Sequence, residues 1–420
     1  MYGNRATTLI ALGLTSAVAL SACSGSAVGG DSQEDTSGPI RIGVIAPLSG
    51  PSASAGVDVP DGAKLAVEWL KEQDALDGRE IKLEVVDDQA TPETAVANVR
   101  KLIDDDVNIF IGTINSPVVL ALAPVMKQTN SVLLTSASHA IEVTHENFSE
   151  NTFRITDNPY MRQVAQARLA TELYPDAKKW SLVGPNHSYG ESTIKSFRAG
   201  LEKYGKELTI NQPIMAPFGA ADYRNSMTKI VGQQPDGVFS SLYGNDAVTA
   251  YKQAADLGLF DDDVVLMDSA NELIVPRAMK EATPDHWIGV HWYWKAYDND
   301  MSKFIGEKYI ADKGQDPSGF VGEAFTAVLA VAQAVEDSKG STSTDDLIPS
   351  LEGMTWETPT GEREIRAEDH QAIKDVNFIR VRGDADAKEG FEVVESKVLP
   401  GADLIEPATP GKAIDYGLKK

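Results

Sequence analysis

The sequence predicts an α/β fold built from two doubly wound parallel sheets, each forming one lobe. The chain has 420 residues, which is too long for a single compact core, and 42% of them are hydrophobic and 24% charged, as in ordinary globular proteins. Short β-branched runs alternate with amphipathic helical stretches, and this alternation occurs in two successive blocks. Alternating strands and helices predict parallel sheets made of right-handed βαβ units.

The first block follows Pro39. Strands are expected over 40–45, 82–86 and 107–111, where β-branched residues dominate. A helix is expected over 92–106, because apolar residues recur there at helical spacing. Thr91 is the expected N-cap of this helix, and Pro92 suits its first helical position.

The second block repeats the architecture without repeating the sequence. Strands are expected at 180–183, 208–210, 237–240 and 264–267, and helices at about 189–204, 222–232 and 245–257. Further helices are expected at about 299–313, 318–337 and 343–352, followed by strands at 377–381 and 391–394. Doubly wound sheets bind ligands at the carboxyl ends of their strands, so two facing lobes predict a site in the cleft between them.

The first 22 residues have the pattern of a bacterial lipoprotein signal peptide. Arg5 is their only charge, and the apolar stretch after it is shorter than the ~20 residues of a membrane-spanning helix. The stretch ends at Leu20-Ser21-Ala22-Cys23, which matches the lipobox, and Cys23 is the only cysteine of the sequence. We therefore expect a lipid on Cys23, with residues 23–39 as a flexible tether. The alternative is an ordinary secretion signal with an incidental cysteine.

Composition excludes several classes of function. A net charge of −24 and a pI near 4.6 argue against nucleic-acid binding, because such a surface repels phosphates. His139 and His145, with Glu142 and Glu146 beside them, fit no standard metal motif. The sequence has no glycine-rich phosphate-binding motif. It therefore predicts no metal and no cofactor.

One segment leaves an enzymatic alternative open. Asn186-His187-Ser188-Tyr189-Gly190 approaches the nucleophile elbow of hydrolases, but Asn186 stands where that motif needs a glycine. We therefore expect a protein that is not an enzyme. The alternative is a secreted serine hydrolase that uses Ser188, with His187 or a distant base.

Ser116 and the loop at 133–140 are the first candidates for ligand contacts. Ser116 follows a strand ending at Gly112 and precedes a helix expected over 117–129. As an N-cap at the carboxyl end of a strand, it and the nearby N–H groups can receive an anion; alternatively, it only caps its own helix. The segment 133–140 reads as a strand leading into small polar residues, which suits a loop close to a ligand.

The aromatic run Trp292-Tyr293-Trp294 is expected on a strand. Trp292 and Trp294 would then face one side and His291 and Tyr293 the other. Either pair can belong to the core while the other lines a cleft.

These residues resemble the type I periplasmic solute-binding proteins of ABC importers, the leucine/isoleucine/valine-binding group. The resemblance rests on Ile42–Pro51, Gly112–Ser116, Tyr189-Gly190-Glu191 and a late helix from Ala324 to Ala334. It extends from about residue 40 to about residue 395. It implies a ligand held between two lobes that close on a hinge, with the chain crossing between them three times.

Carried onto this sequence, the crossings fall near Thr156, His291 and Ile365. The implied organisation is a signal peptide at 1–22, a tether at 23–39, a first lobe at 40–156 plus 291–365, a second lobe at 157–290 plus 366–405, and a tail at 406–420.

The resemblance also implies site residues. In amino-acid-binding members a serine of the first lobe holds the ligand carboxylate, which matches Ser116, and a backbone group of the next loop falls near Ser138. Tyrosines of the second lobe match Tyr189 and Tyr243. The predicted ligand-binding residues are Asn115, Ser116, Ser138, His139, Tyr189 and Tyr243, with Glu272, Trp292 and Tyr293 as further candidates.

Three positions depart from the amino-acid-binding pattern. The threonine that helps hold the head group falls at Ala140. The glutamate that pairs with the ammonium falls near Ala270, with Glu272 two positions away. The aromatic residue that covers the ligand is replaced by Ala55. An unpaired ammonium in a closed cleft costs several kcal/mol unless another carboxylate compensates for the missing glutamate. The departures therefore favour recognition of a carboxylate over recognition of an ammonium group, and Ala55 leaves room for a larger or aromatic ligand.

The predicted function is a monomeric, lipid-anchored, extracytoplasmic receptor that delivers a solute to an ABC permease. The solute classes left open are amino-acid-like compounds, amides and carboxylates, aromatic ones included. A receptor that senses its ligand without transport is the alternative among binding proteins.

Overall fold

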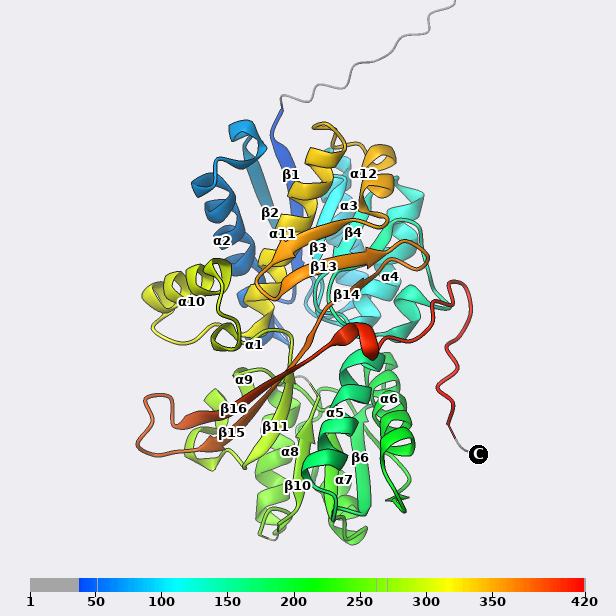
Figure 1. Ribbon diagram of the computed structural model, residues 1–420, viewed down its shortest axis with the longest axis vertical. Helices are drawn as coiled ribbons and strands as arrows, with labels where there is room; N and C mark the ends of the chain where they lie inside the picture. The colour runs from blue at the N-terminus through cyan, green and yellow to red at the C-terminus, as the bar shows by residue number, and fades with distance from the viewer. Residues whose placement is uncertain (1–37, 51, 262, 270, 419–420) are drawn as a thin grey trace, which may run out of the picture. The chain divides into compact units, whose positions relative to one another are not determined.

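The computed structural model describes residues 38–420 apart from Pro51, Asp262, Ala270 and residues 419–420. The predicted signal peptide and Cys23 lie outside the described residues. Those described form two eight-stranded sheets (Figure 1). The predicted α/β class with two parallel-dominated sheets is confirmed.

The first sheet has the strand order β12-β13-β14-β5-β4-β3-β1-β2. Its strands are β1 (Ile40–Ala46), β2 (Ile81–Asp87), β3 (Ile109–Gly112), β4 (Val132–Thr135), β5 (Thr152–Arg154), β12 (Thr355–Thr358), β13 (Gly361–Arg366) and β14 (Gln371–Ile373). Strands β1 to β5 pair in parallel, and β14 joins β5 in parallel, whereas β12, β13 and β14 pair antiparallel. The predicted parallel core therefore carries an antiparallel edge.

The second sheet has the order β16-β15-β11-β10-β9-β6-β7, and β8 pairs with β6. Its strands are β6 (Lys179–Pro185), β7 (Thr209–Ile210), β8 (Ile214–Ala216), β9 (Gly237–Ser240), β10 (Val265–Asp268), β11 (His286–Val290), β15 (Val376–Gly383) and β16 (Phe391–Leu399). The last two strands run antiparallel to their neighbours, and the others are parallel.

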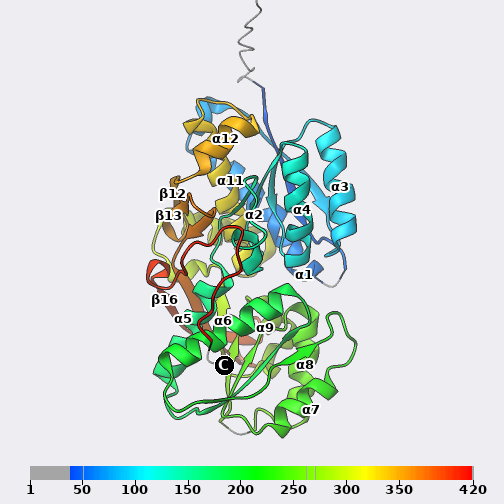
Figure 2. The ribbon, with the colours of Figure 1, turned by 90° about the vertical axis from the view of Figure 1, so that its right-hand side faces the viewer.

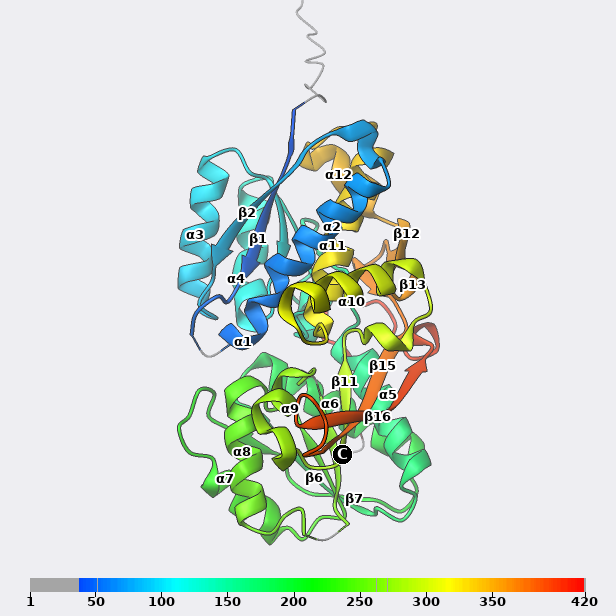
Figure 3. The same cartoon turned by 90° about the vertical axis from the view of Figure 1, so that its left-hand side faces the viewer.

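Helices cover both faces of the first sheet (Figure 3). They are α1 (Ala53–Gly56), α2 (Asp58–Glu72), α3 (Pro92–Asp104), α4 (Ser116–Gln128), α10 (Asp300–Lys313), α11 (Gly319–Asp337) and α12 (Thr344–Leu351). On one face α2 and α11 bury Val59 and Val328 against Val44, and on the other α3 and α4 bury Val99 and Leu122. We call this sheet with these helices the first lobe.

The second sheet is covered in the same way (Figure 2). Its helices are α5 (Pro159–Leu173), α6 (Ser188–Tyr204), α7 (Arg224–Gly232), α8 (Gly244–Asp256) and α9 (Ile274–Met279). Phe197 of α6 stacks on Phe239 of β9 at 4.2 Å between ring centroids, and Ile230 of α7 packs on the opposite face. This sheet with these helices is the second lobe.

Helix α11 is the one described helix that is long and apolar enough to cross a membrane. In the folded protein, 89% of its most apolar stretch of 18 residues is buried. Ala324 and Val328 pack in the core of the first lobe. Its apolar character is therefore accounted for by the core of the first lobe.

Within the described residues, the chain passes between the lobes after β5, after β11 and after β14. The third passage was predicted near Ile365, which is too early. Ile365 lies inside β13, and β14 still pairs with β5 of the first sheet. The two short antiparallel strands hide this boundary, because they lack the β-branched runs that mark the parallel strands.

A buried network of charges joins the three passages. Lys374, between β14 and β15, donates from Nζ to the carbonyl oxygen of His291 at 2.6 Å and to Oε1 of Glu323 at 2.8 Å. The same Nζ lies 3.5 Å from Oδ1 of Asp157. Arg162 binds the Asp157 carboxylate through two hydrogen bonds of 2.6 and 2.7 Å. We call this group the hinge network.

Candidate functional site

A cavity lies where loops of the two lobes meet. The described residues that line it are Ile114, Ser116, Ala137, His139, Tyr189, Tyr243, His291 and Phe320. Its volume is about 40 Å³, little more than the ~30 Å³ that one water molecule occupies in the liquid. Four of the predicted ligand-binding residues, Ser116, His139, Tyr189 and Tyr243, share this cavity.

The first lobe contributes the loops after β3 and β4. Gly112 ends β3 at φ +108°, and a Cβ there would lie 2.2 Å from the carbonyl oxygen of Ile45, so only glycine fits this turn. Ser116 is the first residue of α4 rather than its N-cap as predicted, because Asn115 takes the N-cap position. The Ser138 hydroxyl donates to the Ser116 hydroxyl at 3.4 Å, and both side chains are buried.

Asn115 reaches from the first lobe to the second. Its Nδ2 donates to the Ser52 hydroxyl at 3.1 Å and to the Tyr243 hydroxyl at 3.2 Å. Its Oδ1 is buried without a hydrogen-bond partner among the described groups. Asn115 therefore links the two walls of the cavity, and its Oδ1 can still accept a hydrogen bond.

Two tyrosines form the wall of the second lobe. Tyr189, on the first turn of α6, and Tyr243, at the N-cap of α8, meet edge to face at 5.3 Å between ring centroids. The Tyr189 hydroxyl donates to Ser269 at 3.0 Å. Burial raises the pKa of both tyrosines above the usual range, so both remain neutral hydrogen-bonding groups.

Two histidines complete the cavity. The ring centroids of His139 and His291 lie 5.0 Å apart, and those of His291 and Phe320 lie 5.1 Å apart. Burial lowers the pKa of each histidine well below 6.5, and Arg162 adds to the effect. Both ring nitrogens of His139 and Nε2 of His291 are buried without a hydrogen-bond partner in the described part of the chain, and Nε2 of His139 lies 3.9 Å from Oδ1 of Asp157. The cavity therefore offers neutral imidazoles with unused hydrogen-bonding capacity.

Glu272, a further candidate, does not line the cavity. Its carboxyl group accepts the backbone N–H of His291 at 2.8 Å and that of Gly319 at 2.9 Å, and its Oε1 lies 2.6 Å from Nδ1 of His291. Glu272 therefore holds the backbone and the ring of His291 in place without lining the cavity itself.

The predicted strand at Trp292-Tyr293-Trp294 is wrong, because β11 ends at Val290. Trp292 packs over Gly322 in the core of the first lobe and donates from Nε1 to Ser302 at 3.0 Å. Tyr293 packs in a separate apolar cluster with Leu273 and Phe391. Neither is among the residues that line the cavity, whereas His291, just before them, is.

Two of the three positions that depart from the amino-acid-binding pattern are among the described residues. Ala140 is buried, and its carbonyl oxygen accepts a hydrogen bond from Arg154. Ala55 packs in the core of the first lobe, and Ala270 is outside the described residues. The described lining of the cavity contains no carboxylate.

The histidine next to Ser188 is not arranged to activate it. Nε2 of His187 lies 3.5 Å from the Tyr243 hydroxyl, and the Ser188 hydroxyl is buried with no partner among the described residues. A hydrolytic serine needs a base within hydrogen-bond reach. The geometry gives the hydrolase alternative no support.

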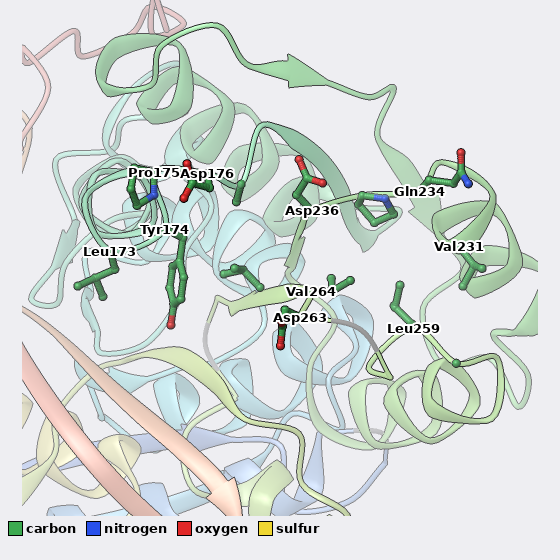
Figure 4. A pocket seen from close by; sticks show the side chains of 14 residues that line it. Leu173, Tyr174, Pro175, Asp176, Val231, Gln234, Asp236, Leu259, Asp263 and Val264 are labelled. Atoms are coloured by element: carbon green, nitrogen blue, oxygen red, sulfur yellow. The ribbon is translucent and has the colours of Figure 1, made fainter.

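A larger hollow of about 720 Å³ lies on the second lobe, away from the cavity (Figure 4). It is lined by Asp176, Asp236 and Asp263 together with apolar side chains such as Leu173. Asp236 already accepts the backbone N–H groups of Lys178 and Lys179, each at 2.8 Å. None of the predicted ligand-binding residues lies there, so we assign the site to the smaller interlobe cavity.

One cluster has the composition of a metal site. Ligand atoms of His145, Asp369 and Glu406 lie within 4.8 Å of one another. Arg366 occupies the Asp369 carboxylate with two hydrogen bonds of 2.8 and 2.6 Å, and Asn158 donates to Glu406 at 2.6 Å. These donors compete with a cation, so the cluster reads as a structural ion-pair group.

Sequence reasoning missed Ile114, Ala137 and Phe320, and it considered His291 only as the neighbour of Tyr293 on one face of the predicted aromatic strand. Ile114 and Ala137 lie beside predicted residues in the two loops, so they could have been predicted from their positions in the sequence. His291 and Phe320 come together only through the second passage and the start of α11, which no local pattern reveals.

The comparisons agree with this architecture. A model of the periplasmic binding protein family matches residues 39–388. The leucine-, isoleucine-, valine-, threonine- and alanine-binding protein of Pseudomonas aeruginosa is 24% identical over 324 residues, 77% of this chain and 84% of that protein. The Leu/Ile/Val-binding protein BraC3 of Rhizobium johnstonii is 26% identical over 218 residues, which span 52% of this chain and 58% of that protein.

Solved structures share the fold. The closed form of a leucine-, isoleucine-, valine-, threonine- and alanine-binding protein from Brucella ovis superimposes with a TM-score of 0.76 at 21% identity, covering 90% of this chain and 99% of that one. A solute-binding protein of an ABC transporter from Rhodopseudomonas palustris BisB5, in complex with 3,4-dihydroxybenzoic acid, gives a TM-score of 0.76 at 21% identity, covering 86% and 98%. The family match, which spans most of the sequence, shows that the chain belongs to the periplasmic binding protein family.

Proposed function

We propose that this protein is a lipid-anchored, extracytoplasmic receptor that binds a small carboxylate, an aromatic one included, between its lobes and delivers it to an ABC permease. The observation that carries this proposal is the chemistry of the interlobe cavity. Its described lining offers hydroxyl groups and neutral imidazoles, and it contains no carboxylate. The ammonium of a free amino acid would enter this cavity without an anionic partner, at a cost of several kcal/mol.

The charges behind the cavity favour an anion. Arg363 joins the hinge network through two hydrogen bonds to Glu323, of 2.7 and 3.0 Å. The network then contains the cations Arg162, Arg363 and Lys374 and the carboxylates Asp157 and Glu323, all buried. Three cations thus face two carboxylates. An anionic solute would offset this excess, and buried charges are stable only when they are paired.

The aromatic lining suits a flat ligand. Tyr189, Tyr243, Phe320 and the two histidines surround the cavity, and aromatic rings pack on one another face to edge or offset. The cavity of about 40 Å³ is far below the ~300–1,000 Å³ of ordinary ligand pockets. A solute therefore requires the lobes to separate, which breaks the contact between Asn115 and Tyr243.

The proposal is tested by isothermal titration of the protein after removal of co-purified solutes. The panel contains benzoate, 4-hydroxybenzoate, benzamide, urea, leucine and valine. We expect carboxylates without an ammonium group to bind most tightly. Tighter binding of leucine or valine would contradict the proposed solute class, and failure of every member to bind a folded sample would contradict the proposed function.

Ser116→Ala tests the hydroxyl at the start of α4. Ser116 lines the cavity and accepts a hydrogen bond from Ser138, so its own proton is available to a ligand carboxylate. We expect the variant to bind the carboxylate about 1–3 kcal/mol more weakly, as measured by titration. Ser131→Ala, a buried serine outside the cavity, is the control. Unchanged affinity in Ser116→Ala would remove this role.

Cys23→Ser tests the proposed lipid anchor. Cys23 is the only cysteine and follows the lipobox residues Leu20-Ser21-Ala22. Without the thiol no lipid is attached, so the variant should appear in the soluble fraction, whereas the wild type stays with the membrane. Fractionation followed by immunoblotting measures this distribution. Equal membrane retention of both proteins would contradict the anchor.

A further inference from the structure

Glu272 fixes the orientation of His291 at the edge of the cavity. Oε1 of Glu272 accepts the backbone N–H of His291 and lies 2.6 Å from Nδ1 of the ring, while Oε2 accepts the backbone N–H of Gly319. Both side chains are at most 2% exposed. Because Nδ1 faces Glu272, Nε2 lies on the other side of a ring that lines the cavity, and it has no partner among the described residues.

The number of protons that this pair holds determines whether Nε2 of His291 can donate a hydrogen bond. With one shared proton, the pair is either a protonated Glu272 donating to Nδ1 or a carboxylate facing an imidazolium, and in both cases Nε2 carries a hydrogen. When that proton is lost, the Glu272 carboxylate takes the hydrogen bond from Nδ1–H, and Nε2 keeps only a lone pair. A carboxylate ligand can only accept hydrogen bonds, so it fits the first state and is repelled by the second.

We propose that Glu272 and His291 form a proton-linked recognition element, in which Nε2 of His291 donates to the solute carboxylate while the pair holds one proton and rejects it when that proton is lost. This inference rests on the proposed function, since it assumes a solute in the interlobe cavity. It assigns Glu272 as a positioning residue and His291 as a ligand contact. The resemblance to amino-acid-binding proteins implied neither role: it gave Glu272 no part in orienting a histidine, and it gave His291 no contact with the ligand.

The surroundings of the pair place its titration above neutrality. Burial raises the pKa of Glu272 to about 8, although Arg162, the two backbone N–H groups and Lys374 act in the opposite direction. Burial lowers the pKa of His291 well below 6.5. The charged and titratable groups that face the pair are Arg162 of α5, Tyr189 of α6, Lys374 and Asp157 of the hinge network, and His139 of the loop after β4. The pair should therefore hold one proton at pH 7 and lose it at higher pH.

The test is titration of the whole protein with benzoate and with benzamide between pH 6.5 and 9.5, in two buffers of different ionisation enthalpy. Benzoate is ionised throughout this range. Its affinity should be nearly constant below pH 8 and fall about tenfold per pH unit above it, with uptake of about one proton on binding there. Benzamide carries both a carbonyl and an N–H donor, so it can bond to Nε2 in either state, and its affinity should change little.

Variants separate this inference from the proposed function. Glu272→Gln keeps a hydrogen-bonding side chain without a titrating group, so its benzoate affinity should not vary with pH. His291→Gln should give the same flat profile with weaker binding. Glu352→Gln, which alters a second carboxyl–histidine pair, 3.1 Å from Nε2 of His370, should keep the wild-type slope.

Three results would overturn the inference: a flat benzoate profile in the wild type, an unchanged slope in Glu272→Gln, or binding of benzamide without benzoate. If another carboxylate of the panel binds instead of benzoate, the same series is run with it and the same results apply. Failure of every panel solute to bind contradicts the proposed function itself.

Discussion

Replacing Lys374 by methionine is expected to lower the free energy of unfolding by about 3–5 kcal/mol, since breaking a buried ion pair leaves its partners charged and unpaired. Lys374 is fully buried, and its Nζ contacts Glu323, Asp157 and the His291 carbonyl oxygen. Although burial disfavours the charged form, Arg162 and Lys374 hold the pKa of Asp157 well below its usual range. Arg162 still binds Asp157 when the lysine is removed, so this carboxylate stays ionised with one cation fewer beside it, which makes the loss of Lys374 costly.

Urea denaturation, followed by fluorescence and by circular dichroism, measures this change. Lys295→Met is the matched control, because Lys295 pairs with Asp316 while about half of its side chain is exposed. Exposed pairs contribute about 0–1 kcal/mol, so the control should stay close to the wild type. Similar small changes in both variants would contradict the assignment of Lys374 as the residue that joins the three passages.

Ala137→Phe should abolish solute binding, with a loss of affinity of about 100-fold or more, equivalent to about 2.8 kcal/mol. Ala137 follows β4 and lines the interlobe cavity. A phenyl ring there would take the space that the solute needs when the lobes close. Overpacking costs about 1–3 kcal/mol of stability, so the variant must first be shown to be folded by circular dichroism.

Ala177→Phe is the control for this substitution. Ala177 has a similar burial and lines the larger hollow of the second lobe. The control should bind the solute as the wild type does, as measured by titration. Loss of binding in Ala177→Phe, with binding kept in Ala137→Phe, would move the site from the interlobe cavity to that hollow.

The parts of the fold that could be predicted are those with strong local patterns. The β-branched runs at β1, β2 and β3 and the apolar spacing of α3 led directly to elements found in the structure. Strand β11 was missed, and a strand was placed too late at Trp292, because the aromatic side chains resemble a strand face. In the structure those side chains pack on small residues, such as Gly322 under Trp292.

The site was predictable where it depends on loops that follow strands. Ser116 and His139 are close to the carboxyl ends of β3 and β4, and both line the cavity. The role of His291 was not predictable, because it depends on the buried carboxyl group of Glu272, which comes from a loop nineteen positions earlier in the chain. Glu272 was chosen from the resemblance alone. It lies near the position of the ammonium-binding glutamate, but it holds a histidine.

Native mass spectrometry of the purified protein tests the central claim, that the interlobe cavity holds a small carboxylate. The wild type should carry one small molecule per chain, which on release proves to be a carboxylic acid without an ammonium group, and Ala137→Phe should carry none. A molecule with no carboxylate, or one that Ala137→Phe retains equally well, would contradict the account.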